Sequence, residues 1–253
     1  MSAPFISQFV VMRIPRIYQA DAVQQGQVLT LSDSAFQHSV KVLRLQPGHE
    51  LELFNGQLRG YFRARLLEVG KRQASVELYD FFPHDNESPL RVHIGQAMSR
   101  GERMDYAVQK ATEMGMASMT PLFTERCEVK LQGERQDKRL QHWQQVAISA
   151  CEQCIRPVLP DIHEPMLLKD WLHSVEADLK LVLHHRTVSP LRELPRPGSV
   201  ALLIGPEGGL SEEEIAQAEA AGFLPVTLGP RVLRTETAPV TALSVCQLLW
   251  GDL

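Results

Sequence analysis

Two glycine-rich segments near the C-terminus constrain the fold of this chain more than any other feature. They are residues 205–209 (GPEGG) and 228–234 (LGPRVLR), called here the first and the second corner. Each follows a short apolar run typical of a strand and precedes a segment with helical character. Glycine lets main-chain groups approach a ligand closely, and two turns at neighbouring strand ends can form one small-molecule cleft. We therefore expect both corners to line one cleft.

The first corner does not match the common phosphate-binding motifs. It is neither G-x-G-x-x-G nor G-x-x-x-x-G-K-[ST], and Glu207 puts negative charge where a phosphate would lie. A neutral or cationic ligand is tolerated there, and S-adenosylmethionine (SAM) carries a sulfonium and an ammonium group. Glu212 to Glu214 have a structural explanation instead, because Ser211 and Glu214 have capping-box spacing and acids suit a helix N-terminus.

The pattern of the chain changes near residue 90. A length of 253 residues with 44% apolar composition allows one large or two smaller domains, and we expect two. Short alternating runs over 13–82, with a hairpin signal at Asn55-Gly56, predict a small β-barrel. Residues 81–89 read as a linker. Beyond it, strand and helix alternate, which predicts an α/β domain with a mainly parallel sheet. The expected strands are 90–98, 118–123, 179–184, 200–204 and 225–228, and the expected helices are 102–114, 137–155, 212–221 and 238–250.

Charge is distributed unevenly between the two expected domains. The chain has a net charge of -4, but residues 12–82 hold 9 Lys and Arg against 7 Asp and Glu, whereas the rest holds 17 against 23. A net +2 followed by -6 suits an N-terminal RNA contact and a cofactor-binding domain behind it. Any basic patch must be local.

The four cysteines predict free thiols in a reducing, cytoplasmic environment. Cys151 and Cys154 form a single C-x-x-C inside a helical pattern, and a zinc site would need two more ligands at suitable spacing. We therefore predict no metal. The first eleven residues are uncharged and too short for a membrane span or an ordinary signal peptide, so we expect no membrane association.

Six blocks in order along the chain resemble the RsmE family, ribosomal RNA methyltransferases of the SPOUT superfamily. The most specific are 202–215 (LLIGPEGGLSEEEI) and 228–238 (LGPRVLRTETA). The others are 13–18 (RIPRIY), 38–45 (HSVKVLRL), 101–115 (GERMDYAVQKATEMG) and 150–160 (ACEQCIRPVLP).

This resemblance implies a fold and a reaction. The fold is a PUA-like β-barrel over 12–82 that binds RNA, followed by a SPOUT domain over 88–253 whose C-terminal chain makes a deep trefoil knot. The reaction is SAM-dependent methylation of N3 of a uridine in the 16S rRNA of the small ribosomal subunit. Such proteins are usually homodimers.

The resemblance also implies which residues surround the cofactor. Main-chain groups would bind adenine while apolar side chains cover the ring; for the leucines and Val232, core packing is the alternative. The expected residues are Leu183, His184, Ile204, Gly205, Pro206, Glu207, Gly208, Leu228, Gly229, Arg231, Val232, Leu233 and Arg234.

Arg234 and Glu236 are the candidate catalytic residues. N3 of uridine is a poor nucleophile while it keeps its proton, so catalysis needs help with that proton and a cation near the growing charge on O2 or O4. The two side chains flank Thr235 in the second corner and offer a positive group and a base. The alternative is that they pair with each other or cap the last helix, for which Thr237 is the expected N-cap.

Positive side chains in the matching blocks are the RNA-binding candidates, because cations there could bind phosphates. For Arg103 the alternative is a solvated helix face, and for His38 it is a buried histidine. The alternating arginines 59, 63 and 65 are expected to lie on the solvent-exposed face of a strand. The candidates are Arg13, Arg16, His38, Lys41, Arg44 and Arg103.

Two other functions stay open at this stage. One is a SPOUT methyltransferase acting on a ribose 2′-oxygen, and the other is a non-enzymatic ribosome-binding protein. The sequence also leaves open which group takes the N3 proton and whether the substrate is naked RNA or an assembled subunit.

Overall fold

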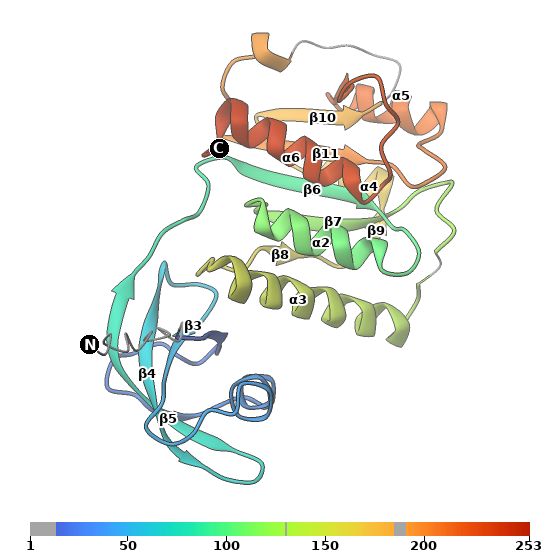
Figure 1. Cartoon of the computed structure of the whole chain (residues 1–253). Helices are drawn as coiled ribbons and strands as arrows, with labels where there is room; N and C mark the ends of the chain where they lie inside the picture. Colours follow the sequence, from blue (N-terminus) through green and yellow to red (C-terminus); the bar gives the residue numbers. More distant parts are fainter. Residues whose placement is uncertain (1–13, 130, 185–190) are drawn as a thin grey trace, which may run out of the picture. The chain divides into compact units, whose positions relative to one another are not determined.

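The computed structural model describes residues 14–129, 131–184 and 191–253 (Figure 1). The chain divides into two compact units, Met1–Asp85 and Asn86–Leu253, each of which is described by itself below. The division falls inside the linker expected at 81–89. None of the helices in the described ranges combines the length and hydropathy that a membrane span requires.

The first unit is a five-stranded sheet in the order β1-β3-β4-β5-β2. Only the β1–β3 pair is parallel; the other pairs are antiparallel. The side chains that alternate inward along β3, β4 and β5 form its core with α1. Strand β5 extends to Pro83, so the expected linker is shorter than 81–89. The elements are β1 Arg16–Tyr18, β2 Val28–Thr30, α1 Asp33–Phe36, the π-helix η1 Gln37–Val42, β3 Glu50–Phe54, β4 Gly60–Val69 and β5 Ala74–Pro83.

Two side chains organise the loops of this sheet. Buried Gln19, just after β1, accepts a hydrogen bond from the main-chain N–H of Ser32, just after β2, at 2.9 Å, which bridges the two edges of the expected barrel. The Asn55 side chain accepts from the main-chain N–H groups of Gln57 and Leu58 at 3.0 and 2.9 Å. Only Gly56 has a positive φ there, 79°. The β3–β4 connection is therefore an Asn-stabilised loop and not the tight turn expected.

The second unit is a parallel seven-stranded sheet in the order β12-β10-β11-β6-β7-β8, with β9 paired to β7. It confirms the expected α/β class. The strands are β6 Arg91–Ala97, β7 Ser118–Phe123, β8 Asp161–Ile162, β9 Met166–Leu167, β10 Leu179–Leu183, β11 Ser199–Ile204 and β12 Leu224–Val226; the helices are α2 Arg103–Glu113, α3 Glu134–Cys154, α4 Leu168–Ser174, the short 3₁₀ helix η2 Leu191–Glu193, α5 Glu212–Ala220 and α6 Thr237–Trp250.

Helices cover both faces of this sheet. Along β11, Leu202 and Ile204 pack in one cluster with residues of α2, α3 and α6, while Ala201 and Leu203 pack in another with residues of α4 and α5. Figure 1 shows α2, α3 and α6 together in front of the sheet. A strand buried on both faces reads as a continuous apolar run, which is what the residues of β11 are.

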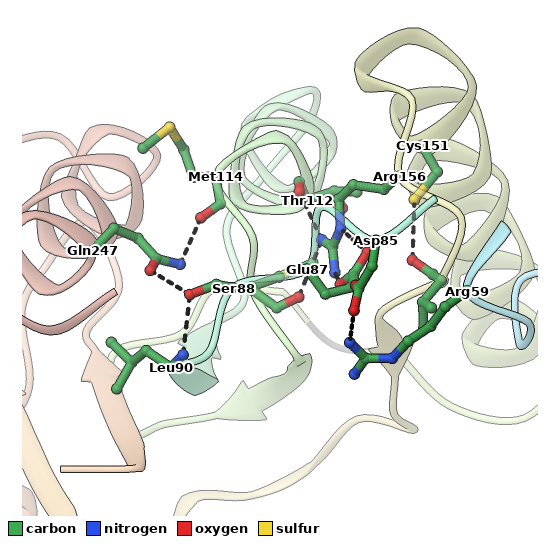
Figure 2. Close-up of polar contacts among 12 residues, drawn as sticks. Arg59, Asp85, Glu87, Ser88, Leu90, Thr112, Met114, Cys151, Arg156 and Gln247 are labelled. Carbon is green, nitrogen blue, oxygen red and sulfur yellow. Dashed lines mark hydrogen bonds and ion pairs between the residues drawn. The ribbon is translucent and has the colours of Figure 1, made fainter. Parts of the chain in front are cut away.

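A buried ion pair fixes the first residues of the second unit. Arg156, just after α3, pairs with Glu87 through Nε at 3.1 Å and through Nη2. Its Nη1 donates to the main-chain carbonyls of Thr112 and Met116 at 2.7 and 3.2 Å, at the C-terminal end of α2 (Figure 2). A cation is favourable at a helix C-terminus. Arg156 therefore ties Glu87 to both α2 and α3.

The next residues are held by α6. Ser88 Oγ donates to Gln247 Oε1 at 2.7 Å and accepts from the Leu90 main-chain N–H at 3.1 Å (Figure 2). Gln247 Nε2 donates in turn to the Met114 carbonyl at 3.1 Å. The chain is thus attached to three helices before β6 begins.

Candidate active site

One cavity of about 720 Å³ lies at the carboxyl ends of β10, β11 and β12. Both corners line it, together with Leu183 and His184 at the end of β10. The carboxyl edge of a parallel sheet is where ligands bind in open α/β folds. The expectation that the two corners converge on one cleft is confirmed.

All but one of the expected cofactor-binding residues line this cavity. The exception is Gly229, whose φ of 92° makes the turn and whose carbonyl accepts from Thr227 Oγ1 at 3.2 Å. The lining residues from that expected set are Leu183, His184, Ile204, Gly205, Pro206, Glu207, Gly208, Leu228, Arg231, Val232, Leu233 and Arg234.

The first corner is held from outside by the loop after β7. Arg126 Nη1 donates to the Gly208 carbonyl at 3.0 Å. The Glu125 main-chain N–H donates to Glu214 Oε1 at 2.7 Å. Glu214 also completes a capping box with Ser211, which confirms that prediction. Arg126 lines the cavity, and sequence reasoning missed it because nothing local to residue 126 points to a corner 82 residues away.

A buried hydrogen-bond chain joins the two corners. Thr235 Oγ1, directly after the second corner, donates to the Gly205 carbonyl in the first corner at 2.9 Å. Gln96 Nε2 of β6 donates to Thr235 Oγ1 at 3.0 Å and to the Ala97 carbonyl at 3.2 Å. Gln96 is 1% and Thr235 6% exposed. Both are residues that sequence reasoning missed as part of the site; polar Gln96 within the otherwise apolar run 94–98 (IGQAM) was the available signal.

The apolar residues of the second corner differ in burial. Leu228 and Leu233 are partly buried and pack against the large cluster of the second unit, so they belong to the core as well as to the cavity. Val232 is 87% exposed and lines the cavity. The core-packing alternative is therefore wrong for Val232.

Arg103 is the cation nearest to both acids of the cavity. It pairs with Glu207 of the first corner, and its Nε lies 4.0 Å from Glu236 Oε2. That Glu236 oxygen is buried and has no hydrogen-bond partner within the described residues. All three residues line the cavity, so Arg103, expected to contact RNA, lies between the corners.

The alternatives for Arg234, Glu236 and Thr237 fail. Arg234 is exposed, and in the part of the chain that the structure describes its side chain makes no ion pair. Its carbonyl accepts from the main-chain N–H groups of Thr237 and Ala238, both at 3.0 Å. The N-cap of α6 is Glu236, not Thr237, and no side-chain bond caps the helix. Neither Arg234–Glu236 pairing nor side-chain capping occupies these groups.

The RNA-binding candidates of the first unit divide by exposure. The Arg16 side chain is only 8% exposed, pairs with Glu52 at 2.9 Å and lies over the Tyr61 ring. Lys41 and Arg44 are exposed, and Arg44 has a positive φ of 57°. His38 is half-buried and Arg13 lies outside the described residues.

The three arginines that were expected on a solvent-exposed strand face form ion pairs with acids. Arg59 pairs with Asp85, Arg63 with Glu50 and Glu52, and Arg65 with Glu50.

Burial determines the pKa values of the four cysteines. It raises the pKa of Cys151 and of Cys246 to about 12, and it raises the pKa values of Cys127 and Cys154 as well. Thiols with raised pKa values are poor nucleophiles near neutral pH. In the described ranges no three His, Cys, Asp or Glu side chains gather as a metal site would require.

Comparisons with known proteins agree with this geometry. A family model described as an RNA methyltransferase domain matches residues 86–247, and one described as an RNA methyltransferase PUA domain matches residues 31–79. Ribosomal RNA small subunit methyltransferase E of Buchnera aphidicola subsp. Schizaphis graminum is 38% identical, over 95% of this chain and 98% of its own length. The chain belongs to the RsmE family.

Solved structures extend this finding. A protein of Legionella pneumophila, described as a methyltransferase in complex with SAM, is 47% identical with a TM-score of 0.92, over 95% of this chain and all of its own. The ribosomal RNA small subunit methyltransferase E of Neisseria gonorrhoeae, bound to SAM, is 38% identical with a TM-score of 0.88, over 95% of this chain and 99% of its own. The expected family is thereby confirmed.

Proposed function

We propose that this protein transfers a methyl group from SAM to N3 of a uridine in the 16S rRNA of the small ribosomal subunit. SAM-dependent methylation of that RNA follows from membership of the RsmE family. The observation that carries the proposal is the single cavity lined by both corners. The atom methylated is the part of the proposal that experiment has to decide.

The cavity fits SAM in size and chemistry. Its volume of about 720 Å³ lies in the range of ligand pockets, roughly 300–1,000 Å³. Glu207 provides a negative charge for a cationic ligand, and Val232, which contacts little protein, provides apolar cover for a ring. Gly205 and Gly208, which have no side chains, line the same space together with Leu228. When bound, SAM supplies the electrophilic methyl group.

Two side chains of the second corner would act on the uridine. Glu236 presents a buried carboxylate oxygen without a hydrogen-bond partner in the described residues, a suitable acceptor for the N3 proton. Arg234, exposed and unpaired within the described ranges, would stabilise negative charge on O2 or O4 as N3 loses its proton. Arg103, next to Glu236, would hold the carboxylate in the cavity. The lone pair left on N3 would then take the methyl group as its bond to the sulfonium sulfur breaks, which leaves neutral S-adenosylhomocysteine.

Exposed cations of both units would bind the RNA backbone. Lys41 and Arg44 have free access to solvent, and Arg103 is 40% exposed at the cavity. Arg13 and His38 remain candidates. Arg16 is left out because its charge is compensated by Glu52 and its side chain is buried.

The chain path between β12 and α6 supports a knot. Strand β12 is the edge strand beside β10, yet α6 packs on the central strands β6 and β11. The second corner must therefore cross back toward the middle of the sheet, where Thr235 contacts Gly205. We include the deep trefoil knot and a homodimer in the proposal. Exposed Tyr106 of α2 and Leu248 of α6, which lie on neighbouring helices, support an interface there.

Mapping the methylated nucleoside tests the proposal directly. Small subunits from cells that lack the enzyme would be incubated with the protein and labelled SAM, digested, and analysed by mass spectrometry. Label in 3-methyluridine is expected. Label in a 2′-O-methylated nucleoside would instead favour the ribose alternative.

Arg234→Ala tests the catalytic assignment. Turnover should fall by about 10²-fold or more, the size expected when one group that stabilises transition-state charge is lost. The dissociation constant for SAM, measured by calorimetry, should change far less. Arg196→Ala, an exposed arginine that does not line the cavity, is the matched control. Full activity of Arg234→Ala would remove this residue from the mechanism.

A further inference from the structure

A second cavity, of about 210 Å³, lies beside the start of α2. Its walls come from the β6–α2 connection, from the segment that precedes α3 and from α3 itself. The residues used below are Met98, Arg100, Gly101, Met104, Arg139 and Trp143. None of them takes part in the proposed methyl transfer.

The two cavities share one segment of chain. Gly101 lines the second cavity, and Arg103, two residues later, lines the first. Gly101 has a φ of 64°, and no heavy atom lies within 4 Å of the point that a Cβ would occupy there, so the turn between the cavities is open on that side. The two cavities are therefore lined by residues only two positions apart in the chain.

Among the described residues, the second cavity is lined by a buried donor without a hydrogen-bond partner and by a cation without an ion pair. Trp143 is 3% exposed, and its Nε1 has no hydrogen-bond partner within the described residues. A buried donor without a partner is costly, so a ligand acceptor at that position would be favoured. Arg139 is exposed and makes no ion pair in the described ranges, whereas Arg100 at the same cavity pairs with Glu128 at 3.0 Å.

Size and wall chemistry limit the ligand. The volume of about 210 Å³ is below the roughly 300–1,000 Å³ of pockets for drug-sized ligands, which favours a ligand the size of one planar ring. Met98, Met104 and Trp143, which are 1%, 1% and 3% exposed, form a soft and aromatic inner wall against which the edge of an unpaired RNA base can pack. A guanidinium at the rim suits a phosphate.

We propose that this cavity binds one unpaired nucleotide of the RNA substrate, adjacent in sequence to the uridine that is methylated. The base lies against Met98, Met104 and Trp143, with a base carbonyl accepting from Trp143 Nε1. A flanking phosphate pairs with Arg139. The inference rests on the proposed function, because it takes the RNA that the first cavity acts on as the ligand.

Arg139→Ala is the decisive variant. With small subunits from cells lacking the enzyme as the RNA probe, both the dissociation constant and KM for RNA should rise by about tenfold, as for loss of one charge-assisted hydrogen bond. The value of kcat at saturating RNA, the dissociation constant for SAM and the melting temperature should stay unchanged. Arg139→Lys should recover most of the RNA affinity.

Arg135→Ala is the matched control. Arg135 is exposed one turn earlier on α3 and does not line the cavity, so its loss should leave RNA affinity within about twofold of wild type if only the cavity cation matters. Equal RNA affinities for Arg139→Ala and Arg135→Ala would overturn the inference. Trp143→Phe, which keeps the aromatic wall but removes the donor, should weaken RNA binding in the same sense.

The same measurements distinguish failure of the proposed function from failure of this inference. Methylation at another RNA atom, with RNA binding still dependent on Arg139, would overturn the N3 assignment and support the cavity. Methylation at N3 with RNA binding independent of Arg139 and Trp143 would support the N3 assignment and overturn the nucleotide-binding role of the second cavity.

Discussion

Thr235→Val tests whether the hydrogen-bond chain between the corners holds the site together. The substitution replaces a hydroxyl by a methyl group of similar size, so packing is nearly preserved. It leaves the Gly205 carbonyl without the donor at 2.9 Å and removes the acceptor at 3.0 Å from Gln96 Nε2. Both lost contacts are buried, so water cannot replace them readily.

The expected cost follows from those two groups. An unsatisfied buried polar group costs about 1–3 kcal/mol. Gln96 keeps its hydrogen bond to the Ala97 carbonyl, so the free-energy cost of losing its bond to Thr235 lies at the low end of this range. The free energy of unfolding should therefore fall by about 3 kcal/mol in total. Thr235→Ser keeps the hydroxyl and should lose less than about half of that.

Urea denaturation followed by tryptophan fluorescence is the assay. All three tryptophans, at positions 143, 171 and 250, lie in the second unit, so the signal reports unfolding of that unit. SAM affinity should fall for Thr235→Val and stay near wild type for Thr235→Ser. If the two variants unfold within about 0.5 kcal/mol of each other, which is the range of ordinary substitutions, the hydrogen-bond chain does not hold the corners.

Three further outcomes are expected. Arg156→Ala should destabilise the second unit by about 3 kcal/mol in urea, because it removes one partner of a nearly buried ion pair with Glu87, whereas Glu152→Ala near the C-terminal end of α3 should cost far less. Stability, measured by urea midpoints, should decline as pH rises from about 9 toward 12. Burial raises the pKa of the Cys246 thiol from 9.0 in the unfolded chain to about 12 in the folded one, so this thiol stabilises the fold only while it is protonated. Cys246→Ala should therefore flatten the decline. Replacing both Lys41 and Arg44 by Ala should lower the slope of log RNA affinity against log salt by about 1 per lost phosphate contact, and an unchanged slope would remove them from the interface.

Local signals predicted much of this fold. Ser211 and Glu214 lie three residues apart and form the capping box that their spacing indicates. Gly115, with a φ of 82°, lies just after α2, where the sequence predicted the end of a helix. Strands β8 and β9 were not predicted, because runs of two residues carry no periodicity. The short helix α4 was missed as well.

Long-range partners could not be predicted from one sequence. Gln96 and Thr235 are 139 residues apart, and only the strand order brings β6 next to the second corner. Arg16 looked like an RNA-binding cation, but the parallel register of β1 and β3 places it opposite Glu52. Its role therefore depended on a strand pairing that no local pattern specifies.

The contacts of the site divide by burial into fixed and exchangeable ones. Thr235 and Gln96 are buried, so breaking their hydrogen bonds costs the full desolvation of each group, and they set the spacing of the two corners. The Arg103–Glu207 pair is about 40% exposed on both sides, and such pairs contribute only about 0–1 kcal/mol. A cationic cofactor beside Glu207, or an RNA phosphate beside Arg103, can therefore replace this ion pair at little cost. Substrate charges would then exchange with Arg103 and Glu207 while the buried chain keeps the cavity in shape.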